Sequence, residues 1–337
     1  MSGNFRRLHP PAPSLSRLHL LLMLVGVIAT PMVFASESVC SRPVADAIPL
    51  LEKMERAWDE VSDYSAQLRK TERFVDGTVI EERGAIKFRK PEQLYLHVLE
   101  GANAGAKLLF PKPGTDSVVL ARAGGLSGAV AGFLIKIPAI GKLIPHEFSL
   151  DDGRLMNGQH HPLPDSSVAA MMHLVSVNLK AATQHLEGSM CFHQSEFIDG
   201  RRATKIEVRL PSDVGTWHTI TEGETPWTIA ADHGQDRYVI LYNNPSVDFE
   251  KALAAGDRIF VPRYYAPRAL LWISDSFSLP VKLEMFDADN RLYEAYSNAD
   301  LRINVGLTDE DFDPILHGFP AVTISGEQRS KIHDNSR

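Results

Sequence analysis

Cysteine is scarce in this sequence, with only Cys40 and Cys191 among 337 residues. Two cysteines exclude a disulfide-rich scaffold and a zinc site built from several thiolates. In an oxidising compartment the two could form one disulfide across a long loop, which in the chain-entropy model stabilises a fold by about 4–5 kcal/mol. The alternative is two separate thiols, and both interpretations stay open.

Basic side chains are outnumbered, because 35 lysines and arginines stand against 42 aspartates and glutamates, a formal net charge of −7. An acidic chain is repelled by phosphate backbones and by anionic membrane surfaces. We therefore expect no nucleic-acid partner. The hydrophobic share of 44% is ordinary for a globular protein and predicts a buried core.

Long apolar runs are confined to the N-terminus, where "LHLLLMLVGVIATPMVFA" follows three arginines. The run is broken by Pro31 and is short for a membrane span. It predicts a signal peptide, residues 1–35, cleaved near Ala35, rather than an uncleaved anchor. Cys40 lacks the preceding small residue that acylation needs. We expect a mature chain outside the cytoplasm with no stable transmembrane anchor.

Recognisable catalytic, metal and cofactor motifs are also missing. Ser127 lies in "GGLSGAV", which lacks the spacing of a nucleophile elbow. The adjacent His160 and His161 are interpreted as part of a loop, because neighbouring rings on an extended segment point to opposite sides and no third ligand has a recognisable spacing. Residues 287–290 lack the later glycine and glutamate of a calcium loop. We expect no catalytic residue, no metal and no cofactor.

Apolar periodicity predicts a mixed α+β chain. Apolar residues at helical spacing predict amphipathic helices over residues 48–61 and about 165–187, the second capped by Asp165 and Ser166. Period-two alternation from residue 64 to 99, again at "RATKIEVRL", and after residue 267 predicts antiparallel strands joined by tight turns. The polar residues 325–337 are expected to be disordered.

Residues 121–145 form an apolar segment rich in glycine and alanine. One interpretation is a lid over an apolar ligand, since its glycines permit movement while its apolar side chains need cover. The alternative is a buried connection against the sheet. The candidate lid residues are Leu126, Phe133, Leu134, Ile137 and Ile140.

A strand, two helices and a closing strand are predicted over residues 216–262, inside the alternating region. Pro226 suits a first helical turn, and Thr225 can cap it. The blocks "HTITEGETPWTIA", "NNP" and "AAGDRIFVP" resemble a LysM module in register. The sequence departs from that family at Pro226, where a leucine is common, and in a loop one residue longer before Gly256.

The LysM resemblance implies binding of N-acetylglucosamine glycans such as peptidoglycan, in a groove between two loops. Backbone amides and apolar contacts suit a neutral sugar there. The residues that correspond to this groove are Gly223, Glu224, Thr225, Pro226, Ser246, Val247, Asp248 and Phe249.

The host of this insert is expected to be one discontinuous domain, residues 44–212 and 264–319. Its blocks "YSAQLRKTERFVDG", "IKFRKPEQLYLHV" and "ALLWISDSFSLPVKLEMFDADNRLYEAYSNADLRINVGLTDEDFDP" resemble the LolA/LolB-like periplasmic lipoprotein carriers, and most closely a bacterial family of unknown function with that fold. The resemblance implies a periplasmic half-barrel, a curved antiparallel sheet around helices whose concave side receives acyl chains.

These observations favour a non-enzymatic cell-envelope protein. It would bind a lipid or lipoprotein in the half-barrel and attach to peptidoglycan through the LysM insert. One alternative is a wall-associated enzyme or regulator of glycan metabolism, which buried acids in a cleft would favour. Another is an envelope-stress sensor or scaffold with a filled cavity.

Overall fold

One large antiparallel sheet organises the chain. The computed structural model describes residues 41–124, 146–150, 152–156, 158–247 and 253–320. In the order of pairing, the strands are β1 (Arg42–Pro43), β8 (Ser189–Phe192), β10 (Arg201–Arg209), β13 (Arg268–Ser274), β14 (Pro280–Phe286), β15 (Leu292–Ile303), β2 (Asp63–Arg73), β3 (Val79–Arg89), β4 (Gln93–Glu100), β5 (Lys107–Phe110), β6 (Val118–Arg122) and β7 (Glu147–Ser149), with β9 (Glu196–Ile198) beside β10.

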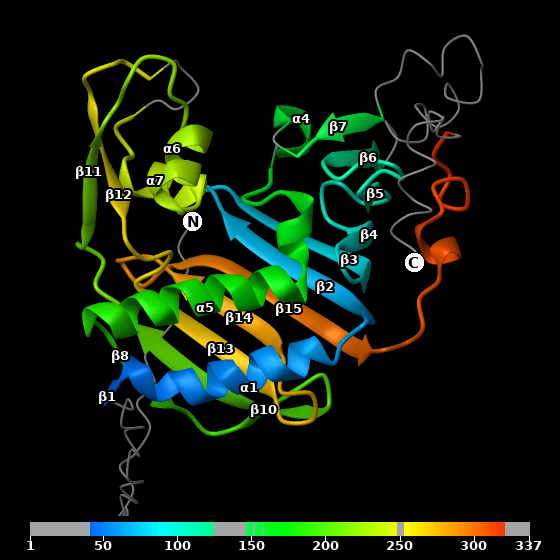
Figure 1. Cartoon of the computed structure of the whole chain (residues 1–337), viewed down its shortest axis with the longest axis horizontal. Coiled ribbons are helices and arrows are strands. Elements are labelled where there is room, and N and C mark those ends of the chain that lie inside the picture. Colours follow the sequence, from blue (N-terminus) through cyan, green and yellow to red (C-terminus); the bar gives the residue numbers. More distant parts are fainter. Residues whose placement is uncertain (1–40, 125–145, 151, 157, 248–252, 321–337) are drawn as a thin grey trace, which may run out of the picture. The chain divides into compact units, whose positions relative to one another are not determined.

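The sheet is curved and open (Figure 1). No pairing among the described residues joins the outer strands β1 and β7. Alternation places Tyr64, Ala66 and Leu68 of β2 on the buried face, as the period-two pattern predicts. The expected α+β class, with an antiparallel sheet that does not close, is confirmed.

Two helices cover one face of this sheet (Figure 1). They are α1 (Ile48–Asp59) and α5 (Val168–His185), close to the predicted ranges. The predicted cap of the second helix is wrong, because Ser167 is the N-cap and its side chain accepts from the Ala170 amide. Residues 163–166 instead form a short 3₁₀ turn, η2 (Leu163–Ser166). The remaining short elements are η1 (Val44–Ala47), α4 (Gly153–Met156) and η3 (Asp309–Phe312).

The insert has the predicted order of strand, helix, helix, strand. Its elements are β11 (Gly215–Thr219), α6 (Pro226–His233), α7 (Arg237–Asn243) and β12 (Arg258–Pro262). Thr225 caps α6 and shares a capping box with Thr228. A small core of its own joins β12, both helices and the residue that follows β11; its members are Ile220, Ile229, Ala230, Ile240, Ile259 and Val261.

The insert interrupts two neighbouring strands of the host, because β10 and β13 pair directly with each other. Its second helix, however, is not independent of the host. Val239 of α7 is 2% exposed and belongs to the main core, while Tyr238 and Tyr242 pack against that core. Tyr238 stacks on His160 at 4.5 Å between ring centroids, and Tyr242 meets the Tyr293 ring edge-on at 4.6 Å. Host and insert therefore share a buried interface.

None of the helices in the described ranges has the length and apolar character needed to cross a bilayer. The signal peptide (1–35) and the polar tail (325–337) both lie outside the described residues. The division into a host domain and a LysM domain stays a prediction.

Candidate functional site

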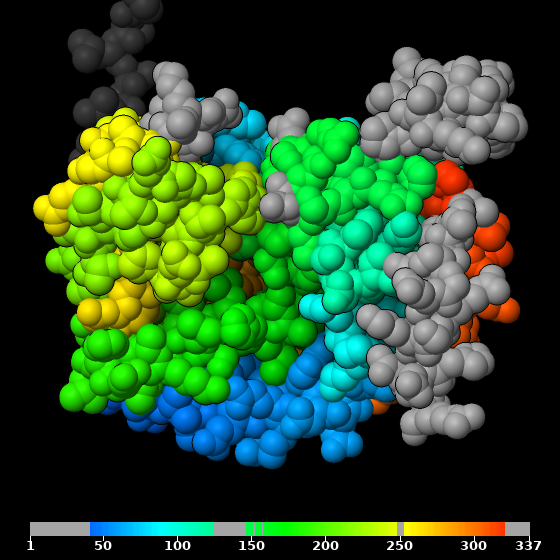
Figure 2. All heavy atoms as spheres, turned by 45° about the horizontal axis from the view of Figure 1, so that its top comes forward, coloured from blue at the N-terminus to red at the C-terminus, as the bar shows by residue number. Residues whose placement is uncertain are grey.

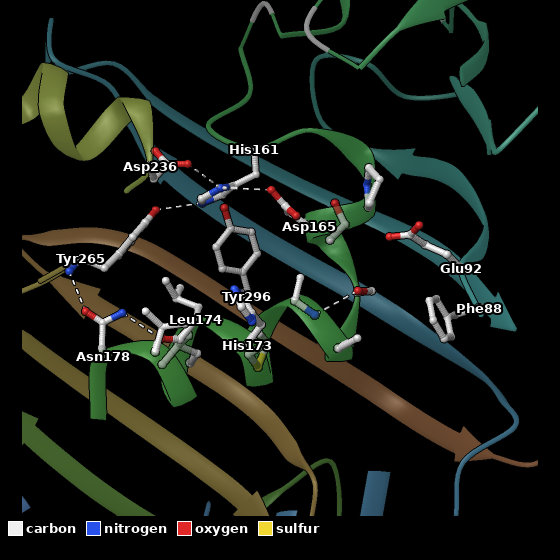
Figure 3. A pocket seen from close by; sticks show the side chains of 18 of the residues that line it. Phe88, Glu92, His161, Asp165, His173, Leu174, Asn178, Asp236, Tyr265 and Tyr296 are labelled. Carbon is white, nitrogen blue, oxygen red and sulfur yellow. Dashed lines mark hydrogen bonds and ion pairs between the residues drawn. The ribbon is translucent and has the colours of Figure 1, made fainter. Parts of the chain in front are cut away.

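A cavity of about 460 Å³ lies between α5, the sheet and the insert. Strands contribute Phe88, Leu283 and Tyr296, and residues 234–236 of the insert complete the wall. Figure 2 shows the surface hollowed where the yellow-green insert meets the green α5. We call this space the α5 cavity; it contains apolar side chains from α5 and a polar end at His161 (Figure 3).

A second cavity, of about 400 Å³, lies between strands β4–β6 and the segment that contains α4 and η2. We call it the β5 cavity. Its apolar lining includes Leu96, Val98, Leu108, Val119, Phe148 and Leu155. His161 and Ser166 line both cavities, so the segment that carries them separates the two spaces.

Two carboxylates face each other across the centre of the sheet beside these cavities. Glu72 of β2 and Glu294 of β15 are register partners, and they are 1% and 0% exposed. Like charges directly opposite on neighbouring strands destabilise a sheet, and a buried charge without a partner costs several kcal/mol. The fold therefore has to supply cations and hydrogen-bond donors to both groups.

Glu72 is satisfied by three groups. The Lys70 ammonium lies 3.3 Å from its Oε2, and the Tyr296 hydroxyl donates to Oε1 at 2.5 Å. The backbone N–H of His160 donates to Oε2 at 3.2 Å. Lys70 also pairs with the buried Glu82 at 3.1 Å.

Glu294 is satisfied by both histidines and a tyrosine. The Nδ1 atom of His160 contacts Oε1, and the Tyr265 hydroxyl donates to the same oxygen at 2.6 Å. The Nε2 atom of His161 lies 3.2 Å from Oε2 and 2.8 Å from the Tyr265 hydroxyl. Burial would raise the pKa of Glu294, but the adjacent His161 and His160 outweigh burial and hold that pKa far below its usual value.

His161 joins the host to the insert. Its Nδ1 lies 3.3 Å from Asp236, the N-cap of α7, and 4.0 Å from Asp165, so the two acids approach the ring from opposite sides (Figure 3). Burial would lower the pKa of His161, but Glu294 and Asp236 raise it well above its usual value. The ring is therefore an imidazolium whose charge is shared between the sheet and the insert.

This arrangement limits what His161 can do chemically. Both nitrogens of the imidazolium carry protons and are engaged with acids, so no lone pair is free to accept a proton from a substrate. The neighbouring His160 is 1% exposed and packs among aromatic rings, and its Nε2 has no hydrogen-bond partner within the described part of the chain. The cluster is suited to holding segments together and to presenting fixed charge at one end of the α5 cavity.

The structure corrects the sequence interpretation of this histidine pair. The chain bends at His160 and His161 rather than running extended, and both rings reach the same carboxylate, Glu294. The expectation that the two rings point to opposite sides of an extended segment was therefore wrong. A signal was present: the alternation that buries Tyr64, Ala66 and Leu68 also places Lys70 and Glu72 on the core face. Charged residues in register with a core face indicate a buried polar network.

Most predicted glycan-groove residues lie in the described part of the insert. Gly223 has a φ of +85° in the turn before α6, a conformation that favours glycine. The Glu224 carboxylate accepts from the Thr221 amide at 2.6 Å, and Pro226 begins α6. Ser246 is exposed, whereas Val247 is partly buried against the small core. Asp248 and Phe249 lie outside the described residues.

The other predicted site residues fall partly outside the described ranges. All five candidate lid residues, Leu126, Phe133, Leu134, Ile137 and Ile140, lie outside them. The strands before and after this segment, β6 and β7, pair with each other. Cys191 is disulfide-bonded, and Cys40, the other cysteine, lies outside the described residues, so their pairing stays a prediction. Among the described residues, Cys191, His193 and Glu207 come close enough to share a metal, but a disulfide sulfur offers no thiolate for one.

Residues 61–220 match the model of DUF1571, described as a protein of unknown function. The match begins just before β2 and ends just after β11, so the DUF1571 segment contains α5 and the histidine pair. No curated protein matches the sequence.

Several solved structures resemble this protein at low identity. The Mycobacterium tuberculosis lipoprotein LppX is 9% identical with a TM-score of 0.36, over 80% of this chain and 99% of that chain. An uncharacterised conserved protein from Thermus thermophilus is 7% identical with a TM-score of 0.35, over 79% and 92%. A LolA superfamily protein from Nitrosomonas europaea is 11% identical with a TM-score of 0.27, over 79% and 97%.

Proposed function

We propose that this protein is a non-enzymatic component of the cell envelope that binds a lipid or the acyl part of a lipoprotein. The observation that carries the proposal is the pair of cavities, about 460 and 400 Å³, between the sheet and the segments that cover it. Volumes of roughly 300–1,000 Å³ with mostly apolar linings are typical of small-molecule sites. A fully packed core would have left no such space.

The β5 cavity suits an acyl chain better than the α5 cavity does. Its described lining combines aliphatic side chains and Phe148 with the cationic side chains of Arg122, Arg154 and His161, and none of the described lining residues is an aspartate or glutamate. Each buried methylene contributes about 0.8 kcal/mol, so ten of them contribute about 8 kcal/mol before the entropy of association is subtracted. Apolar burial of this size supports useful affinity, and the cationic side chains suit an acyl chain that ends in an acidic group.

Native mass spectrometry of the protein purified from membranes, with displacement of a fluorescent fatty acid, tests this proposal. Ala121 lines the β5 cavity, and Ala121→Phe should fill it and weaken binding at least tenfold. Ala45→Phe is the matched control, because Ala45 is exposed before α1. If no lipid co-purifies and Ala121→Phe leaves displacement as it is in the parent, the lipid-binding function is refuted.

We further propose that the insert is a LysM module that attaches the protein to peptidoglycan in the periplasm. The orientation of the insert supports this role, because α7 faces the host while Gly223, Thr225 and Ser246 stay exposed. Replacing the exposed Ser246 by arginine should reduce sedimentation with purified peptidoglycan while leaving circular dichroism unchanged. Equal sedimentation of parent and variant would exclude this groove.

A second candidate function, action on glycan as an enzyme, is favoured by one observation. Asp165 and Asp236 both line the α5 cavity beside His161, and burial raises the pKa of Asp165. Two carboxyl groups in one cleft are the usual requirement for glycoside hydrolysis. Release of soluble fragments from peptidoglycan by the parent, and not by Asp165→Asn, would establish this activity in place of the non-enzymatic proposal.

A further inference from the structure

Two histidines of the insert present ring nitrogens to each other. His218 is on β11 and His233 ends α6, and the Nδ1 atom of the first lies 3.1 Å from the Nε2 atom of the second. Their rings are nearly perpendicular, at 89°, with centroids 5.1 Å apart. The side chain of His218 is 18% exposed, and His233 is exposed, so water can reach the point between them.

A carboxylate fixes the orientation of one of these rings. The Nε2 atom of His218 lies 2.9 Å from Glu224 Oε2, which also accepts from the Thr221 amide at 2.6 Å. With its Nε2–H donated to Glu224, neutral His218 keeps the Nδ1 lone pair, which is the atom that faces His233. Metal-binding histidines have this pattern, in which the second ring nitrogen donates to a carboxylate that fixes the tautomer.

The spacing of the two nitrogens fits one shared cation. Zinc–nitrogen bonds of about 2.0–2.1 Å place two ligand nitrogens about 2.9 Å apart at a right angle and about 3.3 Å apart at the tetrahedral angle. The observed 3.1 Å lies between these values. We propose that His218 and His233 bind a divalent transition-metal ion of the zinc or copper class, with water completing the coordination and Glu224 as the positioning residue.

The proposed ion would join His218 on β11 to His233 at the end of α6, on either side of the loop that contains part of the proposed glycan groove. Residues 220–225, between β11 and α6, contain three of the eight proposed glycan-groove residues. A metal that joins His218 to His233 restrains this segment, and binding of a ligand to the folded form alone stabilises that form. The consequence for function rests on the proposed glycan binding: bound metal would strengthen attachment of the protein to peptidoglycan.

Isothermal titration of the tag-free mature chain with Zn²⁺ tests the site. We expect one saturable event that His233→Ala removes and that Glu224→Gln weakens by about 10- to 100-fold. His185→Ala, at the exposed end of α5, is the matched control and should leave the event unchanged. Circular dichroism of each variant establishes that it is folded. If the parent and His233→Ala titrate alike, the two rings form only a hydrogen bond and the proposal is overturned.

Sedimentation with peptidoglycan, with and without Zn²⁺, separates this inference from the proposed function. If metal binds and increases sedimentation of the parent but not of His233→Ala, the metal site and glycan attachment are both supported. Metal that binds while sedimentation is absent in either condition supports the site and refutes glycan attachment. If sedimentation is equal with and without bound metal, the proposed effect of metal on glycan attachment is overturned.

Discussion

Replacing His161 by glutamine tests whether the buried charge cluster holds the fold together. Glutamine keeps a donor of similar length but removes the charge that Glu294 and Asp236 share. Glu294 is fully buried and keeps only His160, Tyr265 and the glutamine as partners. Removing one member of a buried ion pair typically costs 3–5 kcal/mol. With those partners retained, we expect a loss of about 3 kcal/mol of unfolding free energy.

Equilibrium urea unfolding at pH 7 measures the loss, and a double-mutant cycle assigns it. Glu294→Gln alone leaves the His161 charge without its buried partner, so it should also destabilise the protein. The double variant should be more stable than the sum of the two single losses predicts, because neither charge is then left buried alone. His185→Gln is the control at an exposed position, with an expected change within about 0.5 kcal/mol.

The pH dependence of stability follows from the same groups. Glu294 has a lowered pKa, so its contribution is present above the ordinary value of 4.5 and is lost as the pH falls through the folded value. His161 has a raised pKa, so its contribution is present below the ordinary 6.5 and is lost as the pH rises through the folded value. His161→Gln should shift acid unfolding to higher pH. An unchanged acid limb and a loss below about 0.5 kcal/mol would refute the electrostatic argument.

Three further predictions concern the insert and its junction with the host. Val239→Ala removes two methyl groups from the shared core and should cost about 1–3 kcal/mol, measured by urea unfolding, with a single transition for host and insert. Thr225→Ala removes the cap of α6 and should cost about 1 kcal/mol, with faster hydrogen exchange confined to the insert; protection that is unchanged in α6 would contradict the role of the cap. Asp236→Asn weakens the contact with His161 and should lower the pKa of His161, measured by NMR titration; an unchanged pKa would exclude Asp236 as a cause.

Elements with strong periodicity were predictable from the sequence. The helices over 48–59 and 168–185, the central strands and the four elements of the insert arise from local apolar spacing and caps. The N-cap at Ser167 was missed because Asp165, Ser166 and Ser167 are all capping residues, and only the geometry of η2 chooses among them. Local patterns cannot distinguish equivalent candidates one residue apart.

The polar cluster was not predictable, for a different physical reason. Its members come from β2, the bend at 160–161, α7 and β15, which are distant in sequence. Glu294 and Tyr296 occur in "RLYEAYS", where apolar and polar residues do not separate clearly onto two faces. Only the register of β15 against β2 shows that Glu294 faces Glu72 and needs a cation.

The pairing of β2 with β15 has a consequence for how this chain acquires its structure. The hydrogen bond between Tyr296 and Glu72 joins residues 224 positions apart, so the centre of the sheet closes only when nearly all of the polypeptide is available. Contacts of such long range make folding slow. Until β15 arrives, Lys70 and Glu72 on β2 remain without their opposite strand and stay hydrated. A chain truncated before residue 292 lacks β15 and therefore leaves the edge of β2 open, with charges on the face that becomes the core. We expect such a chain to bind chaperones and to be degraded rather than to form a stable intermediate.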